Sequence, residues 1–189
     1  GLLIVGVGRP ATREMQKLVG LDKVYEAIFT LGASSDTDDR TGQITEAPLT
    51  TEFSDQVLDR FVGEIEQIPP AYSAIKIKGK KMYEAAREGK PVKAKPRSVR
   101  VYNIDLMGPI RPMDPIVQLS LSIHCSSGTY IRAIARDVGA ALGGGGYVEE
   151  LRRNKIGPYS IQDAIELEKL TPEGVQDNLI PIEDFLAKL

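Results

Sequence analysis

Residues 124–142 read HCSSGTYIRAIARDVGAAL and join a strand, a turn and a helix. The strand is expected over 116–125, where alternate residues are apolar and therefore share one face. SSGT forms the turn, and a helix is expected over 130–142, ending in the glycines at 143–146, which favour a helix stop. A strand that leads through a short turn into a helix with an apolar face favours a core in which helices pack on a sheet.

Arg132 lies in the first turn of this helix, between apolar Ile131, Ala133 and Ile134. A cation near a helix N-terminus opposes the helix dipole, and a cation among apolar neighbours needs a carboxylate partner. Two interpretations stay open on this evidence. Either only the aliphatic stem of Arg132 is buried and its charge reaches water, or its guanidinium pairs with a carboxylate in a cleft.

The rest of the chain predicts an α+β fold in which a mixed, mainly antiparallel sheet is flanked by helices. Adjacent alternating strands joined by a short proline-containing turn favour antiparallel pairing over parallel crossovers. A polar loop is expected over 32–42. Strands are expected over 1–7, 24–31, 98–106, 116–125 and 147–159, and helices over 10–19, from Thr51 or Ser54 to 62, and over 82–87, 130–142, 161–167 and 182–189.

Bulk composition is typical of one globular domain: 189 residues, 42% hydrophobic and 26% charged. No apolar stretch approaches the roughly 20 residues that a membrane-spanning helix needs, so no membrane partner is expected. Cys125 and His124 are the only Cys and His, which excludes an internal disulfide and argues against a metal site. As neighbours on a strand they should face opposite ways, and both are expected to be structural. Low cysteine usage favours a reducing, cytoplasmic setting.

Positive charge is concentrated in one segment. Residues 76–100 contain ten basic and two acidic residues, a net charge of +8, whereas the remainder carries 14 basic and 24 acidic residues, a net charge of −10. A solvated surface loop is the simple interpretation. The functional alternative is a surface for a polyanion, in which Lys and Arg neutralise phosphates and make binding depend on salt.

The opening stretch, GLLIVGVGRPA, fits a loose dinucleotide-binding pattern through Gly6, Gly8 and Ala11. Glu26 has about the spacing of the ribose-binding acid, but it lies near the start of its strand, and antiparallel hairpins follow in place of parallel crossovers. An oxidoreductase that binds a nucleotide cofactor is therefore disfavoured, and the glycines are interpreted as a tight connection.

Several long motifs, in the same order, resemble the TruB family, the tRNA pseudouridine synthases that modify a uridine in the T loop. HCSSGTYIRAIARDVGAALG followed by YVEELRRNKIG carries the clearest likeness. IEQIPPAYSAIKIKGKKMYEAAREGK resembles that family's thumb-like insertion, and DKVYEAIFTLGASSDTDDRTGQI resembles its tyrosine strand and acidic loop. The resemblance implies a catalytic domain over 1–189, a basic RNA-binding insertion over 65–97 and, within the 189 residues, no C-terminal RNA-binding domain.

The resemblance also implies roles for three catalytic residues. Tyr25 matches the tyrosine that stacks on the target base, Arg132 the arginine that pairs with the catalytic Asp, and Leu151 an apolar residue beside the base. The family's nucleophilic Asp belongs to a G-x-L-D-P-x-A-x-G loop, of which only the last glycine corresponds to this sequence, as Gly1. The Asp is therefore expected before Gly1, and the 189 residues alone are expected to be inactive.

The remaining implied residues concern the RNA. Asp39 is expected as a polar contact, Tyr72 as a nucleotide or loop contact, and Lys76, Lys78, Lys80 and Lys81 as phosphate contacts. Asp36, Asp38 and Asp39 form a run of mutually repelling carboxylates and are not expected to replace the nucleophile. Asp137 is expected to make a local charge contact. The family implies the T arm of tRNA as partner, no cofactor or metal, and a monomer; a non-catalytic RNA-binding or RNA-remodelling protein is the alternative.

Overall fold

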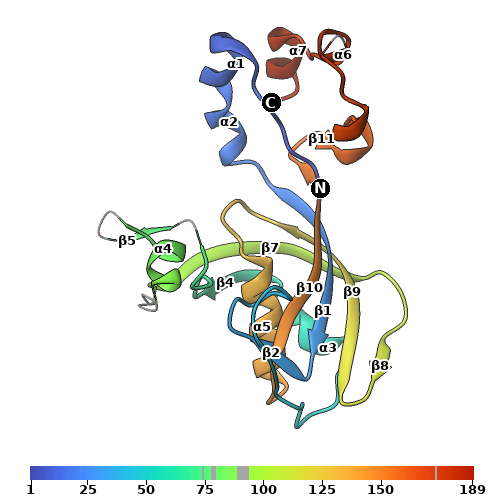
Figure 1. The fold of residues 1–189 in the computed structure, drawn as a ribbon. Helices are drawn as coiled ribbons and strands as arrows, with labels where there is room; N and C mark the ends of the chain where they lie inside the picture. The colour runs from blue at the N-terminus through green and yellow to red at the C-terminus, as the bar shows by residue number, and fades with distance from the viewer. Residues whose placement is uncertain (74, 78–79, 89–93, 173) are drawn as a thin grey trace.

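A computed structural model describes residues 1–73, 75–77, 80–88, 94–172 and 174–189. Its centre is an antiparallel sheet in the order β11-β10-β1-β9-β7-β4, with β8 paired to β9 (Figure 1). The mainly antiparallel α+β fold that the sequence predicts is confirmed. The strands of this sheet are β1 (Lys23–Leu31), β4 (Gly63–Gln67), β7 (Arg97–Leu106), β8 (Arg111–Met113), β9 (Ile116–Cys125), β10 (Gly146–Ile156) and β11 (Tyr159–Ser160).

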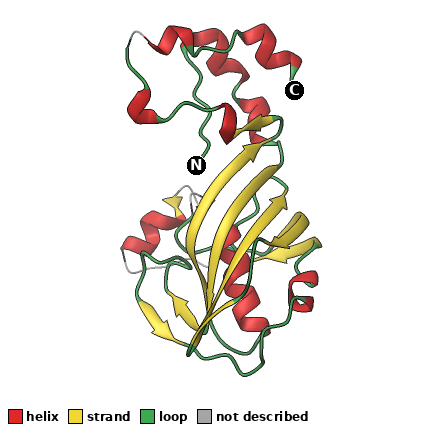
Figure 2. Cartoon of the chain, turned by 90° about the vertical axis from the view of Figure 1, so that its right-hand side faces the viewer, coloured by secondary structure: helices red, strands yellow, loops and turns green. Residues whose placement is uncertain are grey.

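Short helices and two small hairpins complete the fold (Figure 2). The hairpins are β2 (Ala33–Ser35) with β3 (Ile44–Glu46), and β5 (Lys76–Ile77) with β6 (Lys80–Lys81). The helices are α1 (Gly8–Glu14), α2 (Gln16–Val19), α3 (Gln56–Asp59), α4 (Met82–Arg87), α5 (Ile131–Ala141), α6 (Gly174–Asp177) and α7 (Ile182–Ala187), with 3-10 turns η1 (Ile161–Asp163) and η2 (Leu167–Lys169).

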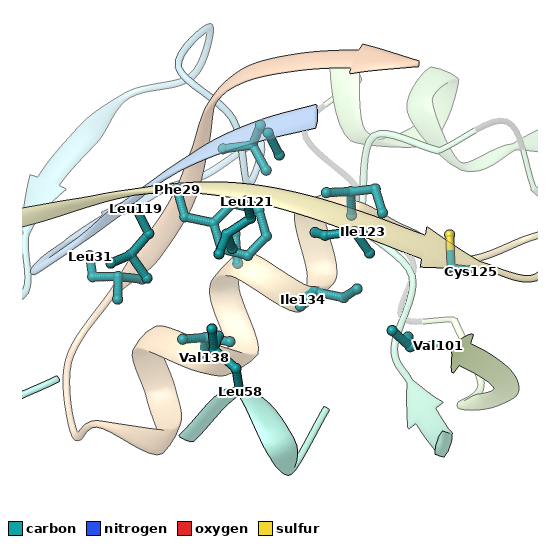
Figure 3. Packing of buried hydrophobic residues seen from close by; sticks show 14 of the residues in the cluster. Phe29, Leu31, Leu58, Val101, Leu119, Leu121, Ile123, Cys125, Ile134 and Val138 are labelled. Carbon is teal, nitrogen blue, oxygen red and sulfur yellow. The ribbon is translucent and has the colours of Figure 1, made fainter. Parts of the chain in front are cut away.

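The main core lies between α5 and one face of the sheet (Figure 3). Leu119, Leu121 and Ile123, the apolar alternation of β9, are fully buried, as are Ile134 and Val138 on α5. Burial of a large aliphatic side chain contributes about 1.5–3 kcal/mol. This packing therefore fixes α5, and with it the direction of the polar side chains in its first two turns.

A second apolar cluster closes the far end of the sheet, where α1, α2, β11 and α7 gather (Figure 1, top). Leu2, Leu18 and Ile156 are buried there with Tyr159 and Phe185. The rings of Tyr159 and Phe185 stack at 5.2 Å, and the Tyr159 hydroxyl donates to the Phe185 carbonyl at 2.8 Å. This cluster joins the first residues of the chain to its C-terminal segment.

Several local predictions are wrong. Residues 1–7 are not assigned to a strand; Leu2 N–H donates to the Arg153 carbonyl at 2.7 Å, while the side chains of Leu3 and Val5 are exposed. The helix predicted over 10–19 is divided at Met15 into α1 and α2, and the helix predicted up to residue 62 is only the single turn α3. A short β2 lies within the expected polar loop, and the helix predicted over 161–167 is reduced to η1.

β4 was not predicted, because its five residues are mostly polar and its partner β7 begins 30 residues further along the chain. Only this long-range pairing, from Gly63–Val101 to Gln67–Arg97, defines it. The segment between β4 and β7 leaves the sheet and carries β5, β6 and α4, projecting to one side (Figure 1, left). Of the insertion predicted over 65–97, residues 65–67 are the end of β4 and Arg97 is the first residue of β7.

Gly139 within α5 and Gly146 at the start of β10 allow a close approach between the helix and the strand. A methyl group added at Gly146 would overlap the Ala135 carbonyl oxygen, and one added at Gly139 would overlap the backbone of Gly145. No larger residue fits at these two positions without moving backbone, so Gly139 and Gly146 are required for the packing of α5 on β10.

Candidate functional site

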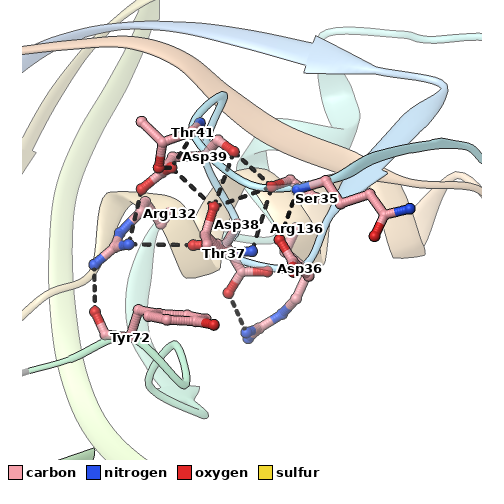
Figure 4. A network of polar contacts seen from close by, with 10 residues as sticks. Ser35, Asp36, Thr37, Asp38, Asp39, Thr41, Tyr72, Arg132 and Arg136 are labelled. Atoms are coloured by element: carbon pink, nitrogen blue, oxygen red, sulfur yellow. Dashed lines mark hydrogen bonds and ion pairs between the residues drawn. The ribbon is translucent and has the colours of Figure 1, made fainter. Parts of the chain in front are cut away.

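Two arginines on α5 organise a polar network beside the sheet (Figure 4). Arg132 and Arg136 are four residues apart and therefore lie on the same side of the helix, one turn apart. Arg132 donates from Nη1 to the Asp39 carboxylate at 2.8 Å and to the Thr37 carbonyl at 3.1 Å, and from Nη2 to the Tyr72 carbonyl at 2.9 Å. Of the two interpretations of Arg132, the structure supports the paired one.

Asp39 is held by more than Arg132. Its Oδ1 accepts from Thr37 Oγ1 at 2.9 Å, from Thr41 N–H at 3.0 Å and from Thr41 Oγ1 at 2.5 Å. Partial burial of the carboxylate acts to raise its pKa, but the hydrogen bonds from Thr41 and Thr37 and the charge of Arg132 prevail, and the pKa of Asp39 lies below its usual value. Asp39 is therefore an oriented, ionised carboxylate at neutral pH.

The acidic loop takes its shape from local turn chemistry. Asp36 Oδ1 accepts from Gln43 N–H at 2.8 Å, and Asp38 adopts φ 61°, the left-handed conformation that Asp tolerates better than most residues. The loop is fastened to β10, since Val148 N–H donates to the Asp38 carbonyl at 3.1 Å and Arg40 N–H donates to the Val148 carbonyl at 3.0 Å. The three carboxylates that the sequence placed in mutual repulsion each have a separate partner.

A cavity of about 550 Å³ opens beside the Arg132–Asp39 pair, within the usual size range of small-molecule sites. Polar side chains, including Asp39, Thr41 and Arg132, line it together with apolar Val148 and Leu151. Leu151 is 47% exposed, so its side chain is not core packing and is free to contact a ligand. The structure therefore brings three predicted site residues, Arg132, Asp39 and Leu151, to one cavity.

Tyr25 lies on the same face of the sheet but lines a neighbouring cavity, of about 450 Å³, with Arg153 and the turn over 126–130. The strand register places Tyr25 opposite Arg153 and Ala27 opposite Leu151, which puts Tyr25 and Leu151 on one face. The ring is half-buried against the main core. Burial raises the pKa of the Tyr25 hydroxyl above its usual value, against the opposing effect of Arg153, so the group is neutral at physiological pH.

The structure describes only some of the residues that are predicted to contact RNA. Tyr72 enters the site through its backbone carbonyl, which accepts from Arg132. Lys76 and Lys80 lie in the β5–β6 hairpin, and Lys78 lies outside the described residues. Lys81 Nζ donates to the Tyr83 hydroxyl at 3.3 Å and lies 5.4 Å from that ring. No described residue of the hairpin lines the cavity, and the hairpin belongs to the segment that projects to one side (Figure 1).

Sequence reasoning missed Thr37, Thr41 and Arg136 as parts of this network. The available signal was the spacing of Arg132 and Arg136, which places both arginines on one side of a helix. The threonines gave no signal, because their contacts with Asp39 depend on the turn that the loop makes. The local contact expected of Asp137 is present: its Oδ1 accepts from Arg136 Nε at 2.9 Å.

His124 and Cys125 face opposite sides of β9, as predicted. Cys125 is fully buried, and burial raises the pKa of its thiol to about 11, so it is not a reactive thiolate. The exposed His124 ring packs against Tyr102 with a centroid distance of 4.6 Å. Within the described residues, no three His, Cys, Asp or Glu side chains gather as a metal site, and no helix is long and apolar enough to cross a bilayer.

Comparison with sequence families defines the class of protein as the pseudouridylate synthases. Residues 1–131 match the TruB family pseudouridylate synthase N-terminal domain, and residues 132–187 match the tRNA pseudouridylate synthase B C-terminal domain. The chain belongs to the TruB family. The boundary between the two matches falls inside α5, so one helix carries residues of both.

Curated relatives agree with this assignment. A tRNA pseudouridine synthase B of Corynebacterium efficiens is 43% identical over 195 residues, covering all of this chain and 63% of the relative. The protein of the same description from a Mycobacterium species (strain KMS) is 41% identical over 177 residues, covering 92% of this chain and 59% of the relative. The chain thus spans about 60% of the length of these relatives.

Solved structures share the fold. A chain from a crystal structure of a Cbf5-Nop10-Gar1 complex is 25% identical with a TM-score of 0.61, covering 95% of this chain and 47% of that one. A chain from an H/ACA RNP bound to a substrate RNA containing 2'-deoxyuridine has a TM-score of 0.59 at 23% identity, covering 95% and 46% of the two chains. The central sheet and α5 are thus an arrangement found in other solved proteins.

Proposed function

We propose that the protein isomerises uridine to pseudouridine in RNA, with a T-loop uridine of tRNA as its substrate. The observation that carries the proposal is the cavity bounded by the Arg132–Asp39 pair and the exposed Leu151, in a chain of the TruB family. In the reaction the bond between ribose C1' and base N1 breaks, the base rotates, and C5 bonds to C1'. The proton on C5 is released, and N1 gains a proton.

The residues that line this cavity and the neighbouring one suit an extruded base. A base taken out of its stack needs an apolar or aromatic surface for its ring, which Leu151 and Tyr25 supply, and polar groups for its edge, which Asp39 and Thr41 supply. Arg132 orients the ionised carboxylate of Asp39 and presents positive charge to any further carboxylate that reaches the cavity. Tyr25 is proposed to stack on the base through its ring and not to transfer a proton.

The basic segment is proposed to bind the RNA backbone. Lys76, Lys78, Lys80 and Lys81 belong to the part of the chain with a net charge of +8, and they precede α4 in the projecting segment. Phosphate contacts fix the position of an RNA without reading its sequence, so this segment supplies affinity and the cavity supplies chemistry. No cofactor is part of the proposal. A protein that acts on tRNA in this way is expected in the cytoplasm, as a monomer.

Tritium release from [5-³H]uridine-labelled tRNA tests the proposal, because C5 loses its hydrogen only if the new carbon–carbon bond forms there. The full-length protein should release one tritium per T-loop pseudouridine formed, and a tRNA with cytidine at that position should release none. Since the family resemblance puts the nucleophilic Asp before Gly1, residues 1–189 alone should release none. Tight tRNA binding by the full-length protein without tritium release would instead support the non-catalytic RNA-binding alternative.

A further inference from the structure

We propose that Arg136 is a positioning residue for this site: by holding Asp38 it fixes the turn of the acidic loop that brings Asp39 to Arg132. The proposal rests on the proposed function for its activity measurement, and on the contacts of α5, the acidic loop and the segment entering the insertion for its geometry. Arg136 does not line the cavity that Arg132 and Asp39 share, so it acts through other residues.

Arg136 joins three segments with one guanidinium. Its Nη1 donates to Asp38 Oδ2 at 3.0 Å, its Nε to Asp137 Oδ1 at 2.9 Å and its Nη2 to the Ile68 carbonyl at 3.0 Å. Asp38 belongs to the acidic loop, Asp137 to α5, and Ile68 to the segment that leaves the sheet after β4. A planar guanidinium with several fixed donors can satisfy acceptors in three directions at once, which an ammonium does less well.

The adjacent carboxylates of Asp38 and Asp39 go to different arginines, one helical turn apart. The backbone between the two carboxylates is left-handed at Asp38, with φ 61°. Asp tolerates this conformation better than most residues with a side chain, but it still favours right-handed or extended backbone, so contacts at Asp38 help to hold the turn. The Asp38–Arg136 ion pair supplies such a contact at the residue that turns.

Asp38 is also the more buried of the two carboxylates, since its side chain is 13% exposed against 24% for Asp39. Burial raises the pKa of Asp38 above its usual value even though Arg136 and Arg132 act to lower it. Removing Arg136 would leave this partly buried carboxylate without its ion-pair partner, a loss that strongly favours moving it into water. Movement of Asp38 into water would carry the next residue, Asp39, away from Arg132.

Both arginines connect the acidic loop to the segment over 68–72 that enters the insertion, here called the entering segment. Arg136 therefore provides a second connection between them. Arg132 binds the loop at Thr37 and Asp39 and the entering segment at the Tyr72 carbonyl. Arg136 binds the loop at Asp38 and the entering segment at the Ile68 carbonyl. The contacts of Arg132 and Arg136 together fix the distance between the acidic loop and the start of the basic insertion.

The test compares Arg136→Met with wild type in the full-length protein, by tritium release over a range of tRNA concentrations. Misplacement of Asp39 by about 1 Å should lower kcat on the order of 100-fold, with KM changed less than about threefold, because RNA binding resides in the basic segment. Arg136→Lys should restore part of kcat. Arg111→Met, on β8 far from the insertion (Figure 1), is the matched control for the loss of one arginine and should keep wild-type values.

A second measurement needs no activity. The Thr41 amide donates to Asp39 and the Arg40 amide to the Val148 carbonyl, so hydrogen exchange over 36–43 reports the fastened loop. Exchange there should accelerate in Arg136→Met and in Asp38→Asn, but not in Arg111→Met, while the sheet stays protected. The double variant should match the single ones, because the two residues act as a pair.

Three results would overturn the inference. If Arg136→Met left both kcat and the hydrogen exchange over 36–43 unchanged, the Asp38–Arg136 ion pair would not hold the loop. A raised KM at wild-type kcat would make Arg136 an RNA contact. A loss of kcat matched by equal loss of folded protein in Asp38→Asn would make the pair merely structural. Absence of tritium release from wild type, in contrast, would end the proposed function and leave the exchange measurement to decide the role of Arg136.

Discussion

The guanidinium of Arg132 and the carboxylate of Asp39 lie 2.8 Å apart although 93 residues separate them in the chain. Their side chains are 22% and 24% exposed, so the pair stands at the wall of a cavity and is neither fully buried nor on open surface. Four hydrogen bonds converge on the Asp39 carboxylate in all, which fixes the plane that it presents to the cavity.

Replacement of Arg132 should affect chemistry far more than affinity. Arg132→Ala in the full-length protein should lower kcat by on the order of 100-fold or more, the magnitude typical of losing one oriented charged donor. Filter binding should give a tRNA Kd within about threefold of wild type, since no described residue of the basic segment lines the cavity. An equal loss of affinity and activity would instead make Arg132 an RNA contact.

The free energy of unfolding should depend on pH in the direction set by the lowered pKa of Asp39. Its pKa is lower folded than unfolded, so its stabilising contribution is complete above the unfolded value of about 3.9 and is lost as pH falls through the folded pKa. Urea unfolding of wild type and Asp39→Asn should therefore differ most at neutral pH and converge in acid. Curves that stay parallel down to pH 2 would exclude this origin.

Asp38 should behave in the opposite way. Because burial raises its folded pKa, its contribution is complete below the unfolded value and is lost as pH rises through the folded pKa. Asp38→Asn should thus lose stability in acid relative to wild type and recover part of that loss towards neutral pH. The same urea series measures it, and a loss that grows steadily with pH would contradict the assignment.

The salt dependence of tRNA binding should depend on the insertion. Replacing Lys78, Lys80 and Lys81 by Gln should reduce the slope of log K against log salt by about 0.7–0.9 for each phosphate that is no longer neutralised. Lys169→Gln is a control, since Lys169 lies in the C-terminal segment and pairs with Glu166 at 2.6 Å. An unchanged slope in the triple variant would place the RNA surface elsewhere.

Gly146→Ala should destabilise the protein by about 1–3 kcal/mol, as expected for overpacking against backbone. The added methyl group would overlap the Ala135 carbonyl and approach Leu31. Gly20→Ala is the matched control, because no atom lies within 4 Å of the position of its added methyl group. Urea midpoints measure both, and equal midpoints for the two variants would show that the packing of α5 against β10 relaxes at little cost.

Much of the fold was predictable, because strong local patterns specify its central elements. The alternation of apolar residues over 116–125 predicts β9 with both boundaries correct. The helix predicted over 130–142 agrees with α5 to within one residue at each end. The short helix α4 was also placed correctly. The family assignment is confirmed, while the roles of Tyr25, Leu151 and the lysines stay predictions.

The failures share a physical cause. β4 exists because it pairs with β7, and a strand of alternating glutamates with one isoleucine has no distinctive local signal. Residues 1–7 have the apolar content of a buried strand, but after Leu2 no strand pairs with their backbone within the described residues, so apolar content alone was misleading.

The antiparallel α+β core, the family and the basic segment could be predicted from the sequence, since each follows from local periodicity, motif or charge, whereas the charge and neighbours of Arg132 left its pairing open. Three features are visible only in the folded protein: Arg132 pairs with Asp39, Asp38 pairs with Arg136, and Leu151 is exposed beside them. Those features depend on the register of β1 with β10 and on one left-handed residue in a loop, and such long-range geometry leaves no periodic trace in the sequence.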